Sequence, residues 1–289
     1  MAFEEVLTRP AVLLKDEPKA ILPTVLTLAT PAILLLLADS FLKAHPSITQ
    51  PGNILSLIGT APEALLTRGI AAIIPYLIPF AFTVILGMAI TILVMLWYGQ
   101  IAAQQHDGKK TMLSEALSRP LALFWQAVAA NLIALVGVFA TFLVFGVIAI
   151  GAMLVVSYVF QQAGWGIGIL LAIIVGLALV AGAIALVALV AGTMWLLDSI
   201  ILFTPQRGIN AIKMALTLTK QKVFHILGIL LVAGVVNYAS SYLSQTVMAI
   251  PFAGFALSLV ISMPFTAWSA MLPAKFFLAY FGRQEPKKR

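Results

Sequence analysis

Six long apolar tracts dominate this 289-residue chain, and each is long enough to cross a lipid bilayer. A membrane-spanning helix needs about 20 mostly apolar residues, because each residue adds about 1.5 Å against a hydrocarbon core of about 30 Å. The tracts are residues 20–42, 69–98, 121–160, 167–204, 223–250 and 252–281. We therefore predict an all-α, polytopic transmembrane bundle of about six spans.

The composition excludes most other classes of protein. Hydrophobic residues make up 62% of the chain and charged residues only 9%, whereas an ordinary soluble domain has about 25% charged residues. A soluble fold of this size could not bury so much apolar surface. A soluble enzyme, a nucleic-acid-binding protein and a disordered chain are therefore excluded. The absence of cysteine also excludes a disulfide scaffold and thiol catalysis.

Two of the tracts are longer than one bilayer crossing requires. As straight helices, residues 121–160 and 167–204 would each reach about 55–60 Å. Either these helices kink or extend beyond the bilayer, or each of them breaks and the chain has eight spans. The candidate break points are Gly146 and Gly151 in the first tract and Gly182 and Gly192 in the second. Because neither break has a polar turn, the sequence favours six spans.

The basic residues predict the orientation. Of the 17 lysines and arginines, all but Lys43 and Arg68 fall on one side of a six-span arrangement. Positive charge is retained on the cytoplasmic side of membranes, so we predict a cell-membrane protein with both termini in the cytoplasm, including a basic tail at 283–289. The partner on this side would be a bilayer with anionic headgroups. The expected headgroup contacts are Arg9, Lys109, Lys110, Arg119, Arg207, Lys213, Lys220 and Lys222.

Short sequence matches predict an internal repeat. Residues 5–10 (EVLTRP) match residues 115–120 (EALSRP) at four of six positions, and residues 214–217 (MALT) echo the same stretch. In the third copy Ile209, Ile212 and Leu216 share one helical face. We predict a single membrane domain of three parallel units, each a short cytoplasmic amphipathic helix followed by a transmembrane hairpin. The units span approximately 1–99, 105–204 and 205–283. An ordinary basic loop before each hairpin is the alternative.

Four stretches carry a resemblance to a known group. They are residues 3–25 (FEEVLTRPAVLLKDEPKAILPTV), 114–120 (SEALSRP), 198–228 (DSIILFTPQRGINAIKMALTLTKQKVFHILG) and 279–289 (AYFGRQEPKKR). With them the chain resembles prokaryotic six-span membrane proteins related to the membrane domain attached to some glycerophosphodiester phosphodiesterases. The resemblance covers nearly the whole chain and implies the same six-span fold. It supplies no catalytic residue, and because the phosphodiesterase catalytic domain has no counterpart here, it does not imply that activity.

Polar residues inside the spans are the candidates for a functional site, because a charge inside a membrane is costly. Asp198 is either a proton or cation site that faces the bundle, or a carboxylate near the inner interface paired with a lysine or arginine such as Arg207 or Lys213. The sequence favours the second alternative. The other uncharged polar groups either line a hydrated path or form interhelical hydrogen bonds. The candidate intramembrane polar site comprises Asp198, Asn237, Ser240, Ser244, Gln126 and Asn131.

The histidines and a stripe of small residues form two further patterns. The three histidines, His45, His106 and His225, are far apart in the sequence and do not have the spacing of metal ligands. We therefore predict no metal site, and no motif indicates a cofactor or an enzyme active site. A stripe of small residues on the fourth span predicts close helix packing. The stripe comprises Ala178, Gly182, Ala185, Ala188 and Gly192.

These patterns favour an organisational function without catalysis. The protein would bind a membrane protein, a lipid or a second copy of itself, within or beside the bundle. The alternative is a small secondary transporter or channel-like permease that uses Asp198 and the polar face of the fifth span. A membrane enzyme acting on lipid headgroups is disfavoured, because no acid–base pair is present. A water-accessible cavity around Asp198 would favour transport, whereas a closed bundle with a broad exposed groove would favour partner binding.

Overall fold

The computed structural model describes residues 3–26, 70–163, 165–248, 250 and 253–282, and this part of the chain contains eight helices. In order, the helices are α1 (Phe3–Asp16), η1 (Pro18–Ile21), α5 (Ile70–His106), α6 (Leu113–Ala163), α7 (Trp165–Phe203), α8 (Gly208–Gln221), α9 (Val223–Met248) and α10 (Gly254–Phe281). Most of the predicted first span, residues 43–69 between the first two predicted spans and the tail 283–289 lie outside the described residues.

Five of these helices are long and apolar enough to cross a membrane. They are α5 from Ile85, α6 to Gln162, all of α7 and α9, and α10 from Ala256. A helix suits these sequences because hydrocarbon offers no partner for backbone amides and carbonyls, which a helix satisfies internally. The chain is therefore a multi-pass helical membrane protein, as the apolar tracts predict.

The two longest tracts form uninterrupted helices. α6 has 51 residues and α7 has 39, which correspond to about 76 Å and 58 Å of helix. Neither helix ends at the glycines that were candidate break points, so the eight-span alternative is wrong. Glycine lowers helix stability by only about 1 kcal/mol, whereas a break inside hydrocarbon would leave several backbone groups without partners.

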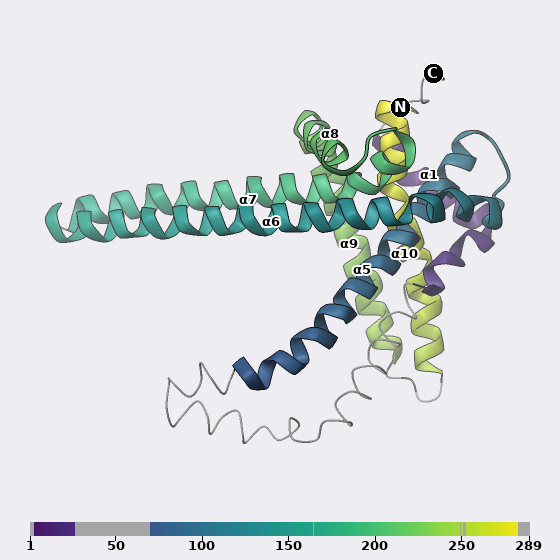
Figure 1. Ribbon diagram of the computed structural model, residues 1–289, viewed down its shortest axis with the longest axis horizontal. Coiled ribbons are helices and arrows are strands. Elements are labelled where there is room, and N and C mark those ends of the chain that lie inside the picture. Colours follow the sequence, from purple (N-terminus) through teal and green to yellow (C-terminus); the bar gives the residue numbers. More distant parts are fainter. Residues whose placement is uncertain (1–2, 27–69, 164, 249, 251–252, 283–289) are drawn as a thin grey trace.

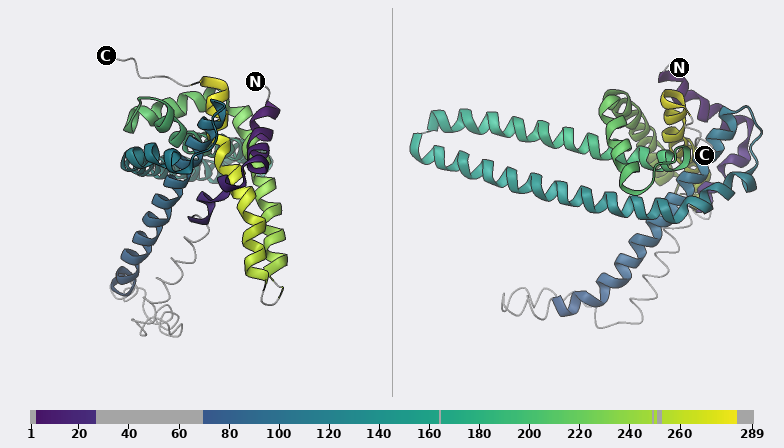
Figure 2. Two further views of the ribbon diagram at one scale, coloured as in Figure 1. Left: turned by 90° about the vertical axis from the view of Figure 1, so that its right-hand side faces the viewer. Right: turned by 45° about the horizontal axis from the view of Figure 1, so that its top comes forward.

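Three arms diverge from one common region of the molecule. They are α5, the α6–α7 hairpin and the α9–α10 hairpin, and the two hairpins point in clearly different directions (Figures 1 and 2). The buried core lies where the arms converge, with Leu196, Ile200 and Phe276 fully buried. The rings of Phe203 and Phe277 stack there, with centroids 5.8 Å apart. Beyond this core, each hairpin is held mainly by its own two helices.

The predicted short amphipathic helices are present in two of the three places. α1 and α8 are separate helices of 14 residues each. In the second unit, however, residues 113–120 form the first turns of α6, and Pro120 lies inside that continuous helix. The prediction of a separate short helix in the unit 105–204 is therefore wrong. Pro120 removes one backbone donor, and because no polar turn follows it, the apolar sequence continues the helix.

Hydrogen bonds of one tryptophan and one tyrosine side chain fix the N-terminal segment on the bundle. The Trp268 indole of α10 donates to the Leu7 carbonyl oxygen of α1 at 2.8 Å. The Tyr98 hydroxyl of α5 accepts from the Thr24 amide at 3.1 Å and donates to the Ile21 carbonyl oxygen at 3.2 Å. These bonds join segments that are far apart in sequence, so the converging end of the three arms is one packed unit.

Candidate functional site

A polar pair links α6 and α7 inside the converging region. The side-chain amide of Asn131 donates to an Asp198 carboxylate oxygen at 2.8 Å and to the Ala127 carbonyl oxygen at 3.0 Å. Asn131 itself is buried, with 6% of its surface exposed. The structure thus brings together two of the six residues of the candidate polar site, from helices that are adjacent along the hairpin.

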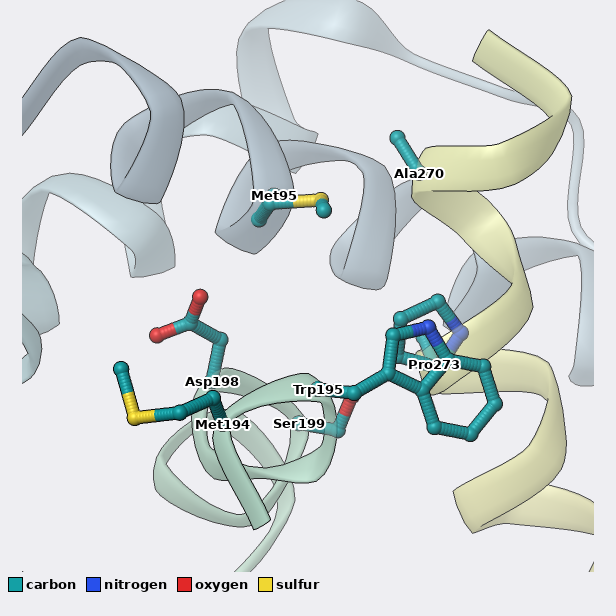
Figure 3. Close-up of a pocket in the computed structure, with 8 residues that line it drawn as sticks. Met95, Met194, Trp195, Asp198, Ser199, Ala270 and Pro273 are labelled. Atoms are coloured by element: carbon teal, nitrogen blue, oxygen red, sulfur yellow. The ribbon is translucent and has the colours of Figure 1, made fainter. Parts of the chain in front are cut away.

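The Asp198 carboxylate faces a small cavity between α5, α7 and α10. Figure 3 shows it pointing across this space toward Met95, with Met194 and Trp195 on its own helix beside it. The cavity has a volume of about 40 Å³, and Ala270 of α10 lies on its far side. A cavity of this size holds one or a few water molecules, whereas pockets for organic ligands measure about 300–1,000 Å³. The space around Asp198 therefore suits bound water better than an organic substrate.

The expected ion pair between Asp198 and Arg207 or Lys213 is not present, and this prediction is wrong. The Arg207 guanidinium instead donates to the carbonyl oxygens of residues 201, 204 and 206, at 3.0, 2.6 and 2.7 Å. It thereby satisfies carbonyls at the end of α7, where the helix leaves them without partners. Partial burial there lowers the pKa of Arg207. Lys213 is on the exposed side of α8.

The polar residues of α9 do not join Asp198. Asn237 is exposed, Ser240 is buried, and the Ser244 hydroxyl donates to the Ser258 carbonyl oxygen of α10 at 3.3 Å. None of the three α9 side chains lines the Asp198 cavity. Gln126, one and a half turns before Asn131 on α6, is also exposed. The candidate polar site is therefore divided between the hairpins, and only Asn131 and Asp198 form a joint feature.

The eight basic residues expected to contact headgroups belong to elements that gather where the arms converge (Figure 1). Arg9 and Lys222 are examples of these residues that also contact other side chains of the protein. Arg9 forms an ion pair with Glu5 at 2.9 Å, and the Lys222 ammonium lies 5.3 Å from the centre of the Tyr280 ring. Lys213 and Lys220 are exposed on α8. We call the convergent region that contains these eight basic residues the basic end.

An open apolar groove of about 550 Å³ lies between α6, α7 and α8. The α8 face predicted from Ile209, Ile212 and Leu216 lines this groove, together with apolar residues of both hairpin helices. The sequence predicted that α8 is amphipathic, but it could not show that α8 would cover the base of the α6–α7 hairpin. The groove is as large as many ligand pockets, in contrast to the cavity at Asp198.

Lys275 is a buried charge that the sequence did not distinguish from the other basic residues. Lys275 of α10 is only 4% exposed, and its ammonium has no hydrogen-bond partner among the described residues. Its position six residues before the end of the last apolar tract gave no signal, because lysine near a span end ordinarily extends to the headgroups. Trp268 and Tyr98, which bind the N-terminal segment, could have been predicted as interface residues, since tryptophan and tyrosine concentrate at membrane interfaces.

The converging region thus offers two features of different chemistry. One is a carboxylate with a single amide partner in a cavity of about 40 Å³. The other is an apolar groove of about 550 Å³ beside the basic helix α8. Comparisons with known proteins do not add a family to this description: no family model, no curated protein and no solved structure matches the chain.

Proposed function

We propose that this protein is a non-catalytic organiser of the membrane, which binds a membrane protein or a lipid beside its helical arms. One contrast carries the proposal. The apolar groove between α6, α7 and α8 measures about 550 Å³ and is open, whereas the cavity at the Asp198 carboxylate measures about 40 Å³. A broad open groove suits binding of a partner, and a small cavity does not provide a route for a solute.

The α6–α7 hairpin supplies most of the surface for such binding. Large apolar side chains are exposed along both of its helices, including Phe139 at 71% and Leu177 at 67%. From Pro120 to Leu197 the sequence contains no charged residue. Apolar surface of this extent must be covered by lipid or by another protein. The hairpin is therefore the part of the molecule that a partner or ordered lipid would contact.

The placement in the membrane is part of this proposal. The positive-inside rule assigns the basic end to the cytoplasm, and a membrane normal running between the diverging hairpins would tilt both of them. At a tilt of about 40° from the membrane normal, the length of α7 along that normal would be about 45 Å and that of α9 about 30 Å. These values match the thickness of the whole bilayer and of its hydrocarbon core. Tilt thus accounts for the length of α7 without a second crossing.

The resemblance to the membrane domain of glycerophosphodiester phosphodiesterases belongs to the same proposal. It rests on the basic end, where α1, α8 and the start of α6 contain the resembling stretches. The three-unit parallel repeat is also part of this proposal, and the separate helices α1 and α8 support it. Neither hypothesis assigns catalysis, which agrees with an organisational function.

Cysteine labelling tests the orientation. The chain contains no cysteine, so Gln161→Cys near the hairpin tip and Ser114→Cys in the first turn of α6 each introduce one exposed reactive site. We expect a membrane-impermeant maleimide to label Gln161→Cys in intact cells and Ser114→Cys only after permeabilisation. Labelling of the denatured proteins provides the reference for full reaction. If both positions react in intact cells, or neither does, the proposed orientation is incorrect.

A photo-crosslinking amino acid tests the binding function. We place it at Leu177 on α7 and, as the matched control, at Val235 on α9, which is 61% exposed. The Leu177 position should give discrete adducts of defined mass in the native membrane, because the hairpin contacts a specific partner or lipid. The Val235 position should give only the mixture of bulk lipids. Identical adducts at both positions would contradict a specific binding surface on the hairpin.

Transport through Asp198 is the second candidate function, and the Asp198–Asn131 hydrogen bond is the observation that favours it. Buried polar groups in spans mark proton and ion pathways in many membrane proteins. We expect the purified protein in vesicles to show no pH-dependent flux, and the variant Asp198→Asn to behave like the wild type. A flux that is present in the wild type and lost in Asp198→Asn would establish transport and overturn the organisational function.

A further inference from the structure

The groove between α6, α7 and α8 provides few polar contacts to an occupant. The hydroxyls of Thr141 and Thr193, which line it, already donate to carbonyl oxygens of their own helices at 2.7 Å and 2.6 Å. The other uncharged lining residues are apolar or glycine. An occupant buried in this groove therefore finds van der Waals contacts and few hydrogen bonds, and an aliphatic chain meets that requirement.

A single charge lies at the groove. Among the described residues that line it, Lys220 alone is charged, and its side chain is exposed on α8. Between Asp198 and Glu285 the sequence contains no acidic residue, so α8 carries no carboxylate to compete for this ammonium. The charge is complementary to a phosphate, and the apolar walls are complementary to a hydrocarbon chain.

Resting on the proposed function, we propose that this groove binds an anionic phospholipid, with an acyl chain between α6, α7 and α8 and its phosphate at the Lys220 ammonium. An amphipathic helix with basic residues lies at the level of the headgroups, which is the depth at which a phosphate would meet Lys220. The acyl chain would then run along the base of the hairpin. The lipid would hold α8 against α6 and α7 by filling the space between them.

Two substitutions separate the two parts of the site. Lys220→Gln removes the charge and leaves the groove. Gly137→Leu fills the groove and leaves the charge, because a Cβ at Gly137 would meet no atom within 4 Å. Lys19→Gln removes an exposed charge elsewhere at the basic end, and Gly146→Leu adds the same side chain to α6 at another position with open space. These two serve as the matched controls.

Native mass spectrometry of the delipidated protein, titrated with dioleoylphosphatidylglycerol or dioleoylphosphatidylcholine, measures the binding. We expect the wild type and both controls to bind the anionic lipid about fivefold more tightly than the zwitterionic one, since one lysine near a headgroup contributes about that factor. Lys220→Gln should abolish this preference and retain the weaker binding. Gly137→Leu should remove the tightest-binding molecule of either lipid.

The outcomes distinguish this inference from the proposed function. If both lipids bind equally to the wild type, or Lys220→Gln keeps the preference, the assignment of the phosphate to Lys220 is wrong. If Gly137→Leu binds lipid as the wild type does, the groove is not the site, although a lipid-binding function at another surface stands. The wild type could instead form a dimer or carry another protein that is lost in Gly137→Leu. That result would show that the groove binds a protein and not a phospholipid.

Discussion

Replacing Asn131 with leucine should lower the free energy of unfolding by about 1–2 kcal/mol. The Asn131 amide is the hydrogen-bond partner that the structure gives the Asp198 carboxyl. Without it, the carboxyl would face Met95 and the other mostly apolar walls of the small cavity. Asp198 is partly buried, so a carboxyl that loses its partner there keeps part of the cost of desolvation. Asp198→Asn should cost less than about 1 kcal/mol, because an asparagine oxygen can still accept this hydrogen bond.

Unfolding in detergent micelles at increasing dodecyl sulfate fraction, followed by circular dichroism, measures this difference. Gln126→Leu is the matched control, since it removes an exposed amide from the same helix and should leave the midpoint unchanged. The double variant Asn131→Leu/Asp198→Leu removes both polar groups and should recover most of the lost stability. Equal losses in Asn131→Leu and Gln126→Leu would show that the Asn131–Asp198 hydrogen bond does not stabilise the bundle.

The spans could be predicted from the sequence because length and hydropathy determine them directly. The predicted tract 223–250 agrees within two residues with α9 (Val223–Met248), and the tract 167–204 agrees within two residues with α7 (Trp165–Phe203). A segment that enters hydrocarbon must satisfy its backbone within itself, so apolar length alone predicts a helix. The start of α6 was less predictable, because its first turns are amphipathic and continue through Pro120 without a turn.

The arrangement of the arms could not be predicted, because lipid-facing and helix-facing surfaces are both apolar. The small residues of α7 illustrate this: Ala188 and Gly192 are buried, whereas Ala178 and Ala185 of the same stripe are exposed. The sequence singled out Asn131 and Asp198 as polar residues in spans. It grouped them with the polar face of α9, since nothing in one sequence says which helices become neighbours. Their pairing depends on the packing of α6 against α7.

The close approach of α8 to α7 depends on one position without a side chain. A Cβ built on Gly192 would lie 2.5 Å from the Cγ2 methyl of Thr219 and 3.3 Å from that of Ile226. These atoms belong to α8 and to the first turn of α9, which are buried against α7. A larger side chain at this position must therefore displace the Thr219 and Ile226 side chains or the helices that carry them.

Gly192→Leu is expected to destabilise the protein by about 3 kcal/mol, at the upper end of the cost of overpacking a core. Gly176→Leu is its matched control on the same helix, because a Cβ there meets no atom within 4 Å, and it should unfold at the wild-type dodecyl sulfate fraction. Displacement of α8 should also accelerate trypsin cleavage after Lys213, since a protease needs locally opened backbone. If Gly192→Leu unfolds and is cleaved as Gly176→Leu is, α8 does not depend on this contact, and its position on the hairpin must be maintained by other residues.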